Sequence, residues 1–279
     1  ETDDHIVVEN HTLLDPGYGE WTIEGWIYLD GTQIVNRIID KSNQGGWPTN
    51  RGWYLAVRTE GIPSIPIGNH LHMSFSEDSG QMLHTASMDE IPLNKWTHIV
   101  VTSKLHGNEI TEYYIDGNFV ETVYNTHDGN YSNGSNDVIN TPCYSDLDIN
   151  IGGRTLSPPG YNQFDGRIAN LKILDKFITT VGEAQALMSG SIPTGFEENV
   201  VADWKLNTGS GLTAIDYSAN RHHGEILGSE EQWVFRIDGC MDFLAVNYIP
   251  EATDDDGSCI YEVPDNAIVI NELMIKPLM

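Results

Sequence analysis

Acidic side chains crowd one short stretch near the end of the 279-residue chain. Asp254, Asp255 and Asp256 are consecutive, and Asp242 and Asn247 precede them in a segment bounded by two cysteines. Calcium binds six to eight oxygen atoms from carboxylates, amides and carbonyls, so this density of ligands predicts a Ca²⁺ site. The spacing is not that of an EF-hand, which needs alternating Asp residues and a terminal Glu. The alternative is a solvated turn held by hydrogen bonds.

A second group of residues has the chemistry of sugar recognition. The C–H faces of sugars pack on aromatic rings, while Asn, Asp and Arg bind the hydroxyl groups. The candidates are four aromatic residues in segments that are expected to form surface loops, namely Trp47, Tyr131, Tyr144 and Tyr161. Arg51 is a further candidate, as a polar ligand of the sugar. Trp53 lies in a strand-like run and is expected in the core instead.

The ten histidines raise a zinc hypothesis. His70 and His72 would share a strand face, and His222 and His223 are adjacent. Neither pair has a Cys or His partner at a spacing typical of a zinc site. We therefore do not expect zinc.

The charge of the chain limits its partners. Asp plus Glu number 41 against 14 Lys plus Arg, a formal net charge of −27. This charge repels phosphate backbones and anionic headgroups, so nucleic acid is not expected as a partner. No stretch approaches the roughly 20 consecutive apolar residues that span a bilayer, and membrane insertion is not expected either. The carboxylates serve as Ca²⁺ ligands, or they only keep an extracellular protein soluble.

The three cysteines form an odd set. Cys240 and Cys259 bracket the acidic loop, and in an oxidising compartment a disulfide between them would contribute about 3 kcal/mol through loop closure. Cys143 is then a small buried residue or a partner for a cysteine outside this sequence. Because the chain starts at Glu1 and ends just after an apolar run, we expect both ends to be cuts in a longer polypeptide.

The elements that must position these residues are strands. Runs rich in Val, Ile, Thr, Tyr and Trp alternate with Gly, Pro, Asn and Asp clusters, a pattern that predicts an all-β, two-sheet antiparallel sandwich. The expected strands are 5–9, 20–29, 34–40, 52–58, 71–76, 96–104, 110–115, 119–124, 147–151, 167–174 and 200–206.

Two local signals add detail to this sandwich. Asp116 and Gly117 separate two aromatic and β-branched runs, which predicts a hairpin because both residue types accept positive φ. One short helix is expected around Glu183, capped by Thr179 or Thr180.

Two segments are similar to strands of laminin-G-like domains, namely residues 20–27 (EWTIEGWI) and 94–102 (NKWTHIVVT). Further matches follow in the family's order, at residues 114–117, 149–153, 164–168, 171–174, 201–206 and 216–220. The resemblance covers about 230 residues. It implies a concanavalin A-like jelly roll with one short helix, joined to a small disulfide-clipped loop module.

The resemblance also implies a metal site. In laminin-G-like domains a loop comparable to the one with Asp216 and Asn220 often helps to hold a structural Ca²⁺, so both residues become candidate ligands. Pentraxins share the sandwich and hold Ca²⁺ in an acidic cluster after the position of Ile151 and Gly152. Arg, Thr and Leu occupy residues 154–156 here, which argues against pentraxin-type recognition.

Sandwiches of this kind include glycoside hydrolases with a Glu-x-Asp-x-x-Glu pattern on one strand. Asp89-Glu90 and Asp146-x-Asp148 do not reproduce that pattern. The sequence also lacks a Gly-x-Ser-x-Gly elbow, a phosphate loop and a His-Glu-x-x-His motif. We therefore expect no enzyme activity.

Two further resemblances concern the end of the chain. Residues 239–259 resemble a short cysteine-bounded repeat of large surface proteins in Bacteroidota, and residues 268–274 resemble the opening of a lamin-tail-like domain. The predicted domains are the sandwich at 1–236, the acidic repeat at 237–262 and the start of a further domain at 263–279. Together they imply an exported multidomain protein, a cargo of type IX secretion.

These expectations define a secreted, non-catalytic, Ca²⁺-stabilised recognition or adhesion module at the cell surface, binding a glycan or a surface protein. The alternative is a structural or protein–protein assembly domain without a sugar site. A third class, a glycoside hydrolase or its accessory module, requires two carboxyl groups about 5 to 9 Å apart in a cleft.

Overall fold

The computed structural model describes residues 5–31, 33–43, 51–59, 67–76, 82–106, 110–124, 126–127, 142–153, 163–228, 238–240, 245–249, 252, 254–255 and 257–260. The chain divides into two compact units, Glu1–Val234 and Phe235–Met279. Among the described residues, no helix has the length and apolar character needed to cross a membrane. The bounds of the three predicted domains stay predictions.

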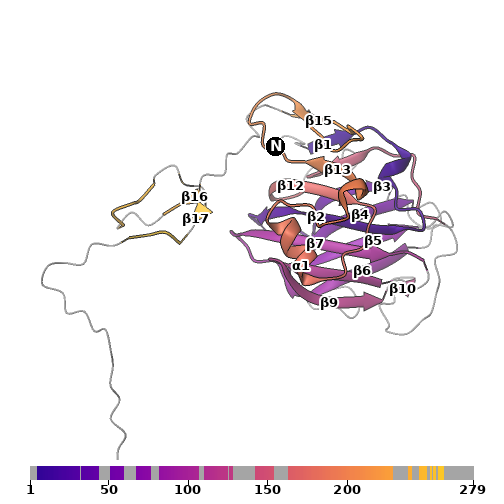
Figure 1. Ribbon diagram of the computed structural model, residues 1–279, viewed down its shortest axis with the longest axis horizontal. Helices are drawn as coiled ribbons and strands as arrows, with labels where there is room; N and C mark the ends of the chain where they lie inside the picture. The colour runs from indigo at the N-terminus through magenta and orange to yellow at the C-terminus, as the bar shows by residue number, and fades with distance from the viewer. Residues whose placement is uncertain are drawn as a thin grey trace, which may run out of the picture. The chain divides into compact units, whose positions relative to one another are not determined.

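The first unit contains two antiparallel sheets (Figure 1). The larger sheet has nine strands in the order β10-β6-β5-β4-β3-β11-β1-β15-β14. Their bounds are β1 His5–Val8, β3 Val35–Ser42, β4 Gly52–Arg58, β5 His70–Ser76, β6 Met82–Glu90, β10 Thr126–His127, β11 Ile149–Ile151, β14 Thr213–Ala214 and β15 Gly224–Leu227.

The smaller sheet has six strands in the order β13-β12-β2-β7-β8-β9. Their bounds are β2 Glu20–Leu29, β7 Trp96–Lys104, β8 Ile110–Ile115, β9 Asn118–Tyr124, β12 Gly166–Leu174 and β13 Val200–Trp204. Two 3-10 turns, η1 (Thr12–Leu14) and η2 (Glu197–Asn199), precede β2 and β13.

The core lies between the two sheets because alternate side chains of each strand point to one face. Trp21 and Ile23 of β2 and Trp53 and Leu55 of β4 are buried in one cluster. The rings of Trp21 and Trp53 meet edge to face with centroids 5.7 Å apart. Burial of each such side chain contributes about 1.5–3 kcal/mol, so the two sheets hold each other in place.

The predicted sandwich is confirmed in its central parts. Strands β2 and β7 are antiparallel neighbours that pair along β2 from Glu20 to Tyr28. The predicted hairpin joins β8 to β9, and Asp116 and Gly117 have φ angles of 48° and 70°. The nearly all-β unit with two antiparallel sheets therefore has the fold class that the sequence indicates.

Strand β6 is absent from the strands expected above. Leu83 places a large apolar side chain in the core cluster. Two positions further on, the same face carries Thr85, whose hydroxyl lies 2.7 Å from that of Tyr113. Polar and small residues fill most of this strand, so its hydrophobic alternation is weak.

The single helix of the first unit's described part, α1 (Val181–Met188), packs on the outer face of the six-stranded sheet (Figure 1). The Thr180 hydroxyl accepts a hydrogen bond from the Glu183 amide, and the Glu183 carboxylate accepts one from the Thr180 amide, which is the expected capping box. Ala184 and Leu187 of the helix are buried in one cluster with Val100, Tyr114 and Leu174 of the sheet.

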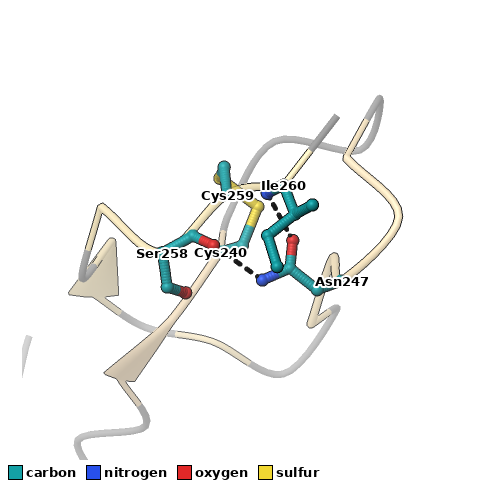
Figure 2. Close-up of a disulfide and its surroundings, with 5 residues drawn as sticks. All are labelled: Cys240, Asn247, Ser258, Cys259 and Ile260. Carbon is teal, nitrogen blue, oxygen red and sulfur yellow. Dashed lines mark hydrogen bonds between the residues drawn. A yellow bond between two sulfur atoms is a disulfide. The ribbon is translucent and has the colours of Figure 1, made fainter. Parts of the chain in front are cut away.

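The second unit is held by the predicted disulfide between Cys240 and Cys259, which is confirmed (Figure 2). Two short parallel strands, β16 (Asp238–Gly239) and β17 (Asp254–Asp255), lie within it. The Asn247 side chain donates to the Ser258 carbonyl at 2.8 Å and accepts from the Ile260 amide at 2.7 Å. The amide nitrogen and the amide oxygen of Asn247 therefore both stabilise the loop beside the disulfide.

Candidate ligand-binding site

The outer face of the nine-stranded sheet carries an unusual set of polar side chains. On β4, Trp53, Leu55 and Val57 enter the core, so Tyr54 and Arg58 lie on the opposite face. Ala56 lies between them on the same face. In the register of β4 with β5, Tyr54 pairs with Ser74, Ala56 with His72, and Arg58 with His70, so these β5 residues share that face.

The neighbouring strands extend this set. Arg37 of β3 is paired with Ala56, and His84 of β6 is paired with Ser74. We call Arg37, Tyr54, Arg58, His72 and His84 the arginine–histidine cluster. Its members come from four adjacent strands, so the sheet register alone brings them together.

The rings of the arginine–histidine cluster form a continuous series across the sheet. The Arg37 guanidinium carbon lies 3.4 Å from the centre of the Tyr54 ring. The Tyr54 and His72 rings are 5.4 Å apart, and the His72 and His84 rings stack at 5.2 Å with an angle of 21° between their planes. Aromatic rings and polar nitrogen atoms thus alternate from β3 to β6.

Several buried polar atoms of this face have no hydrogen-bond partner in the described part of the chain. They are Nε and Nη1 of Arg37, Nε of Arg58, both ring nitrogens of His70 and His72, and Oγ of Ser74. Arg37 is 2% exposed and His72 0%. An unsatisfied buried polar group costs about 1–3 kcal/mol, so a fold keeps such a concentration only where something compensates it.

The electrostatics of the cluster keep its imidazoles neutral. Burial, aided by His84, Arg58 and Arg37, holds the pKa of His72 well below its ordinary value. Burial together with the two arginines lowers the pKa of His84 to about 4. At pH 7 the cluster therefore presents two guanidinium cations and two neutral imidazoles, each of which has one N–H to donate.

This pKa shift predicts a loss of stability in acid. Below pH about 6.5 the unfolded chain protonates His84 while the folded protein does not, so the free energy of unfolding falls as the pH drops towards 4. Between pH 7 and 4.5 this residue should remove about 2 kcal/mol. Urea unfolding of the wild type and of His84→Gln at both pH values measures the effect. The loss should be smaller in the variant, and equal losses would show that His84 is not kept neutral.

A second polar network organises the loop after β13. Oδ1 of Asp216 accepts from the backbone amides of Asp203 and Ser218, both at 2.8 Å. Oδ2 accepts from the Ser218 hydroxyl at 2.8 Å and the His222 amide at 2.7 Å. The fully buried carboxylate is therefore saturated by four protein donors.

Residues 1–180 match the family model of the concanavalin A-like lectin/glucanases superfamily. The chain belongs to this superfamily. A comparison with curated proteins found no significant match.

Several solved structures are similar to this chain. One is a protein from Bacteroides ovatus described as a candidate carbohydrate-binding protein, with a TM-score of 0.56 and 16% identity over 81% of this chain and 58% of the other. The present chain thus spans less than two thirds of that protein. Another is a heptameric SAP-like pentraxin from Limulus polyphemus, with a TM-score of 0.46 and 13% identity over 68% of this chain and 78% of the other.

Two of the ligand-binding residues predicted from the sequence, Arg51 and Tyr144, are described and lie outside the arginine–histidine cluster. Arg51 is exposed and precedes β4, where its amide donates to the Asn43 side chain at 2.7 Å. Tyr144 is 48% exposed, and its neighbour Cys143 lies in the core cluster with its thiol 3.3 Å from the Gly52 carbonyl. Both candidates therefore flank the start of β4, away from Arg58 at its end. Trp47, Tyr131 and Tyr161 lie outside the described residues.

Of the two calcium candidates in the first unit, Asp216 has both carboxylate oxygens engaged by protein donors. Every oxygen of Asp216 already accepts two hydrogen bonds, and the Asn220 side-chain amide donates to the Val201 carbonyl at 2.9 Å. Within the described residues, no group of three or more His, Cys, Asp or Glu side chains is gathered as a metal site. Calcium at this loop stays a prediction that the geometry does not favour.

The other calcium candidates lie in the second unit, around the disulfide. Asn247 uses both ends of its amide within the loop. Asp242 and Asp256 lie outside the described residues, and for Asp254 only the backbone of β17 is described. Calcium binding here also stays a prediction.

Sequence reasoning missed the arginine–histidine cluster, apart from the observation that His70 and His72 share a strand face. That observation is confirmed by their pairing with Arg58 and Ala56. A signal was present in β4, where Tyr54 and Arg58 alternate with three apolar residues and must occupy the face away from the core.

Proposed function

We propose that this chain is a non-catalytic glycan-binding module of a secreted multidomain surface protein, and that the arginine–histidine cluster binds the sugar. Membership of a superfamily of lectins and glucanases supports the class of ligand. The disulfide between Cys240 and Cys259 is consistent with an extracellular protein, because such bonds persist in oxidising compartments. Calcium bound to the second unit would stabilise that unit.

One observation carries this proposal, namely that stacked rings and unpaired donors share one face of the sheet. A sugar offers C–H faces that pack on rings and hydroxyl groups that accept hydrogen bonds. The cluster offers the Tyr54, His72 and His84 rings together with donors on Arg37 and His72. Arg58 and His84 are partly exposed, whereas the other members are buried. A ligand therefore enters beside Arg58 and His84.

The experiment uses His72→Phe, which keeps an aromatic ring of similar size and removes both nitrogens. Because these nitrogens have no partner among the described residues, the change should leave the free energy of unfolding unchanged or raise it. Binding of the best ligand from a glycan array should weaken at least about tenfold, or about 1.4 kcal/mol, in calorimetry.

The matched control is His106→Phe, because His106 is an exposed histidine that follows β7 and lies outside the arginine–histidine cluster. Its binding should equal that of the wild type. Unchanged affinity in His72→Phe, or silence of the folded wild-type protein across the whole array, would contradict the proposal. Silence would favour the alternative class, a structural or assembly domain.

A further inference from the structure

The buried cations of this protein differ sharply in how they are paired. Lys41 donates to the Asp15 carboxylate and to the Ser145 carbonyl, both at 2.7 Å. Lys172 donates to the Glu24 carboxylate at 2.5 Å. Both side chains are almost fully buried, and each has an anion in direct contact. Close pairing is the expected solution, because an uncompensated buried charge is costly.

Arg37 departs from this pattern. Its nearest described carboxylate, that of Asp40, is 3.7 Å from Nη1, which is beyond hydrogen-bonding distance. The other oxygen of Asp40 already accepts from the amide and the hydroxyl of Ser42, at 2.7 and 2.6 Å. Arg37 is as buried as the paired lysines, yet its Nε and Nη1 hydrogens have no acceptor among the described residues.

Arg58 adds a second cation to the same face. Both guanidinium groups lie close enough to His72 and His84 to disfavour their protonation. Two arginines therefore lie on the same face as Tyr54, His72 and His84 in a chain of net charge −27, and the carboxylate beside Arg37 is that of Asp40. Local positive charge in so acidic a protein points to a specific use.

The chemistry of the unpaired atoms indicates the group that would satisfy them. Nε and one Nη of a guanidinium form a planar fork that matches the two oxygens of a carboxylate or a sulfate. A neutral hydroxyl can accept hydrogen bonds from the guanidinium but leaves its charge uncompensated. The unpaired imidazole nitrogens of His72 lie beside the ring that Arg37 covers and supply a further donor.

We infer that the arginine–histidine cluster is specific for acidic glycans, with Arg37 and Arg58 binding a carboxylate or sulfate group on the sugar while the rings hold its C–H face. This inference rests on the proposed function and narrows its ligand class. The shared chemistry is an anionic group on a saccharide, and the choice between carboxylate and sulfate is left to the probes.

The test compares acidic and neutral forms of one sugar by calorimetry. The probes are an oligogalacturonide and its methyl ester, in which each carboxylate charge is replaced by a small neutral ester, and a sulfated oligosaccharide with its desulfated counterpart. The wild type should bind at least one acidic form about tenfold or more tightly than its neutral counterpart. Rising salt should weaken the acidic complex, since its contacts include charge pairs.

Variants assign the effect to the two arginines. Arg37→Met and Arg58→Met should each weaken acidic binding at least about tenfold, whereas Arg221→Met, at an exposed loop position, should not. Arg37→Lys keeps the charge without the fork, and its affinity should lie between those of the wild type and Arg37→Met. Arg37→Lys also serves if Arg37→Met fails to fold.

Two outcomes would overturn the inference and leave the proposed function standing. One is equal affinity for the acidic and neutral forms, and the other is acidic binding that neither arginine variant changes. Failure of every saccharide, acidic or neutral, to bind the folded protein would instead remove the proposed function together with the inference.

Discussion

Replacing Asp216 by alanine is expected to lower the free energy of unfolding by about 3–5 kcal/mol, because the change leaves several buried donors without an acceptor. The carboxylate holds the amides of Asp203, Ser218 and His222 and the Ser218 hydroxyl. These donors join the end of β13 to the following loop. Urea or thermal unfolding followed by circular dichroism measures the loss.

The matched control for this prediction is Glu225→Ala, which removes an exposed carboxylate from β15. The free energy of unfolding of this variant should stay within about 0.5 kcal/mol of the wild type. Calcium should not rescue Asp216→Ala, since the Asp216 carboxylate accepts its hydrogen bonds from protein donors. A loss below about 1 kcal/mol for Asp216→Ala would show that the four hydrogen bonds are not maintained in solution.

The second large effect is expected at Glu24, whose buried carboxylate lies 2.5 Å from Lys172 Nζ and 3.0 Å from His98 Nε2. Glu24→Ala leaves Lys172 as a buried charge without its close partner, because the Asp203 carboxylate is 3.9 Å away. Breaking a buried pair on one side costs about 3–5 kcal/mol. The free energy of unfolding should fall by that amount at pH 7.

A double variant tests the physical reason. Glu24→Leu with Lys172→Met removes both charges and keeps apolar volume, so it should be clearly more stable than Glu24→Ala, with a coupling energy of about 1–3 kcal/mol in the mutant cycle. Additive losses in the single and double variants would mean that the two charges do not interact. Glycan binding should be unaffected in folded variants, because this network lies on the other sheet.

Much of the fold is predictable from the sequence because core strands alternate strongly. In β2 the apolar Trp21, Ile23 and Ile27 enter the core, and the pattern predicts both the strand and its buried face. The Asp116-Gly117 hairpin follows from turn chemistry alone. Strand β6 could not be found in this way, since Thr85 and Ala86 give little contrast between its two faces.

The candidate site was not predictable, because its members are distant in sequence and meet only through strand pairing. Arg37 and His84 come from β3 and β6, which are separated by β4 and β5 in the sheet. The register also shifts between Arg37 and Ile39, a local irregularity that hydrophobic alternation does not reveal. Sequence reasoning therefore favoured loop aromatics, of which Tyr144 is described and lies beside Gly17.

A crystal structure of the protein with a bound acidic oligosaccharide would show directly whether the arginine–histidine cluster holds the sugar. We expect a sugar ring packed against Tyr54 and His72, with its carboxylate or sulfate oxygens about 2.7–3.0 Å from the Arg37 guanidinium nitrogens. A sugar held instead at the start of β4, by Arg51 and Tyr144, would contradict it.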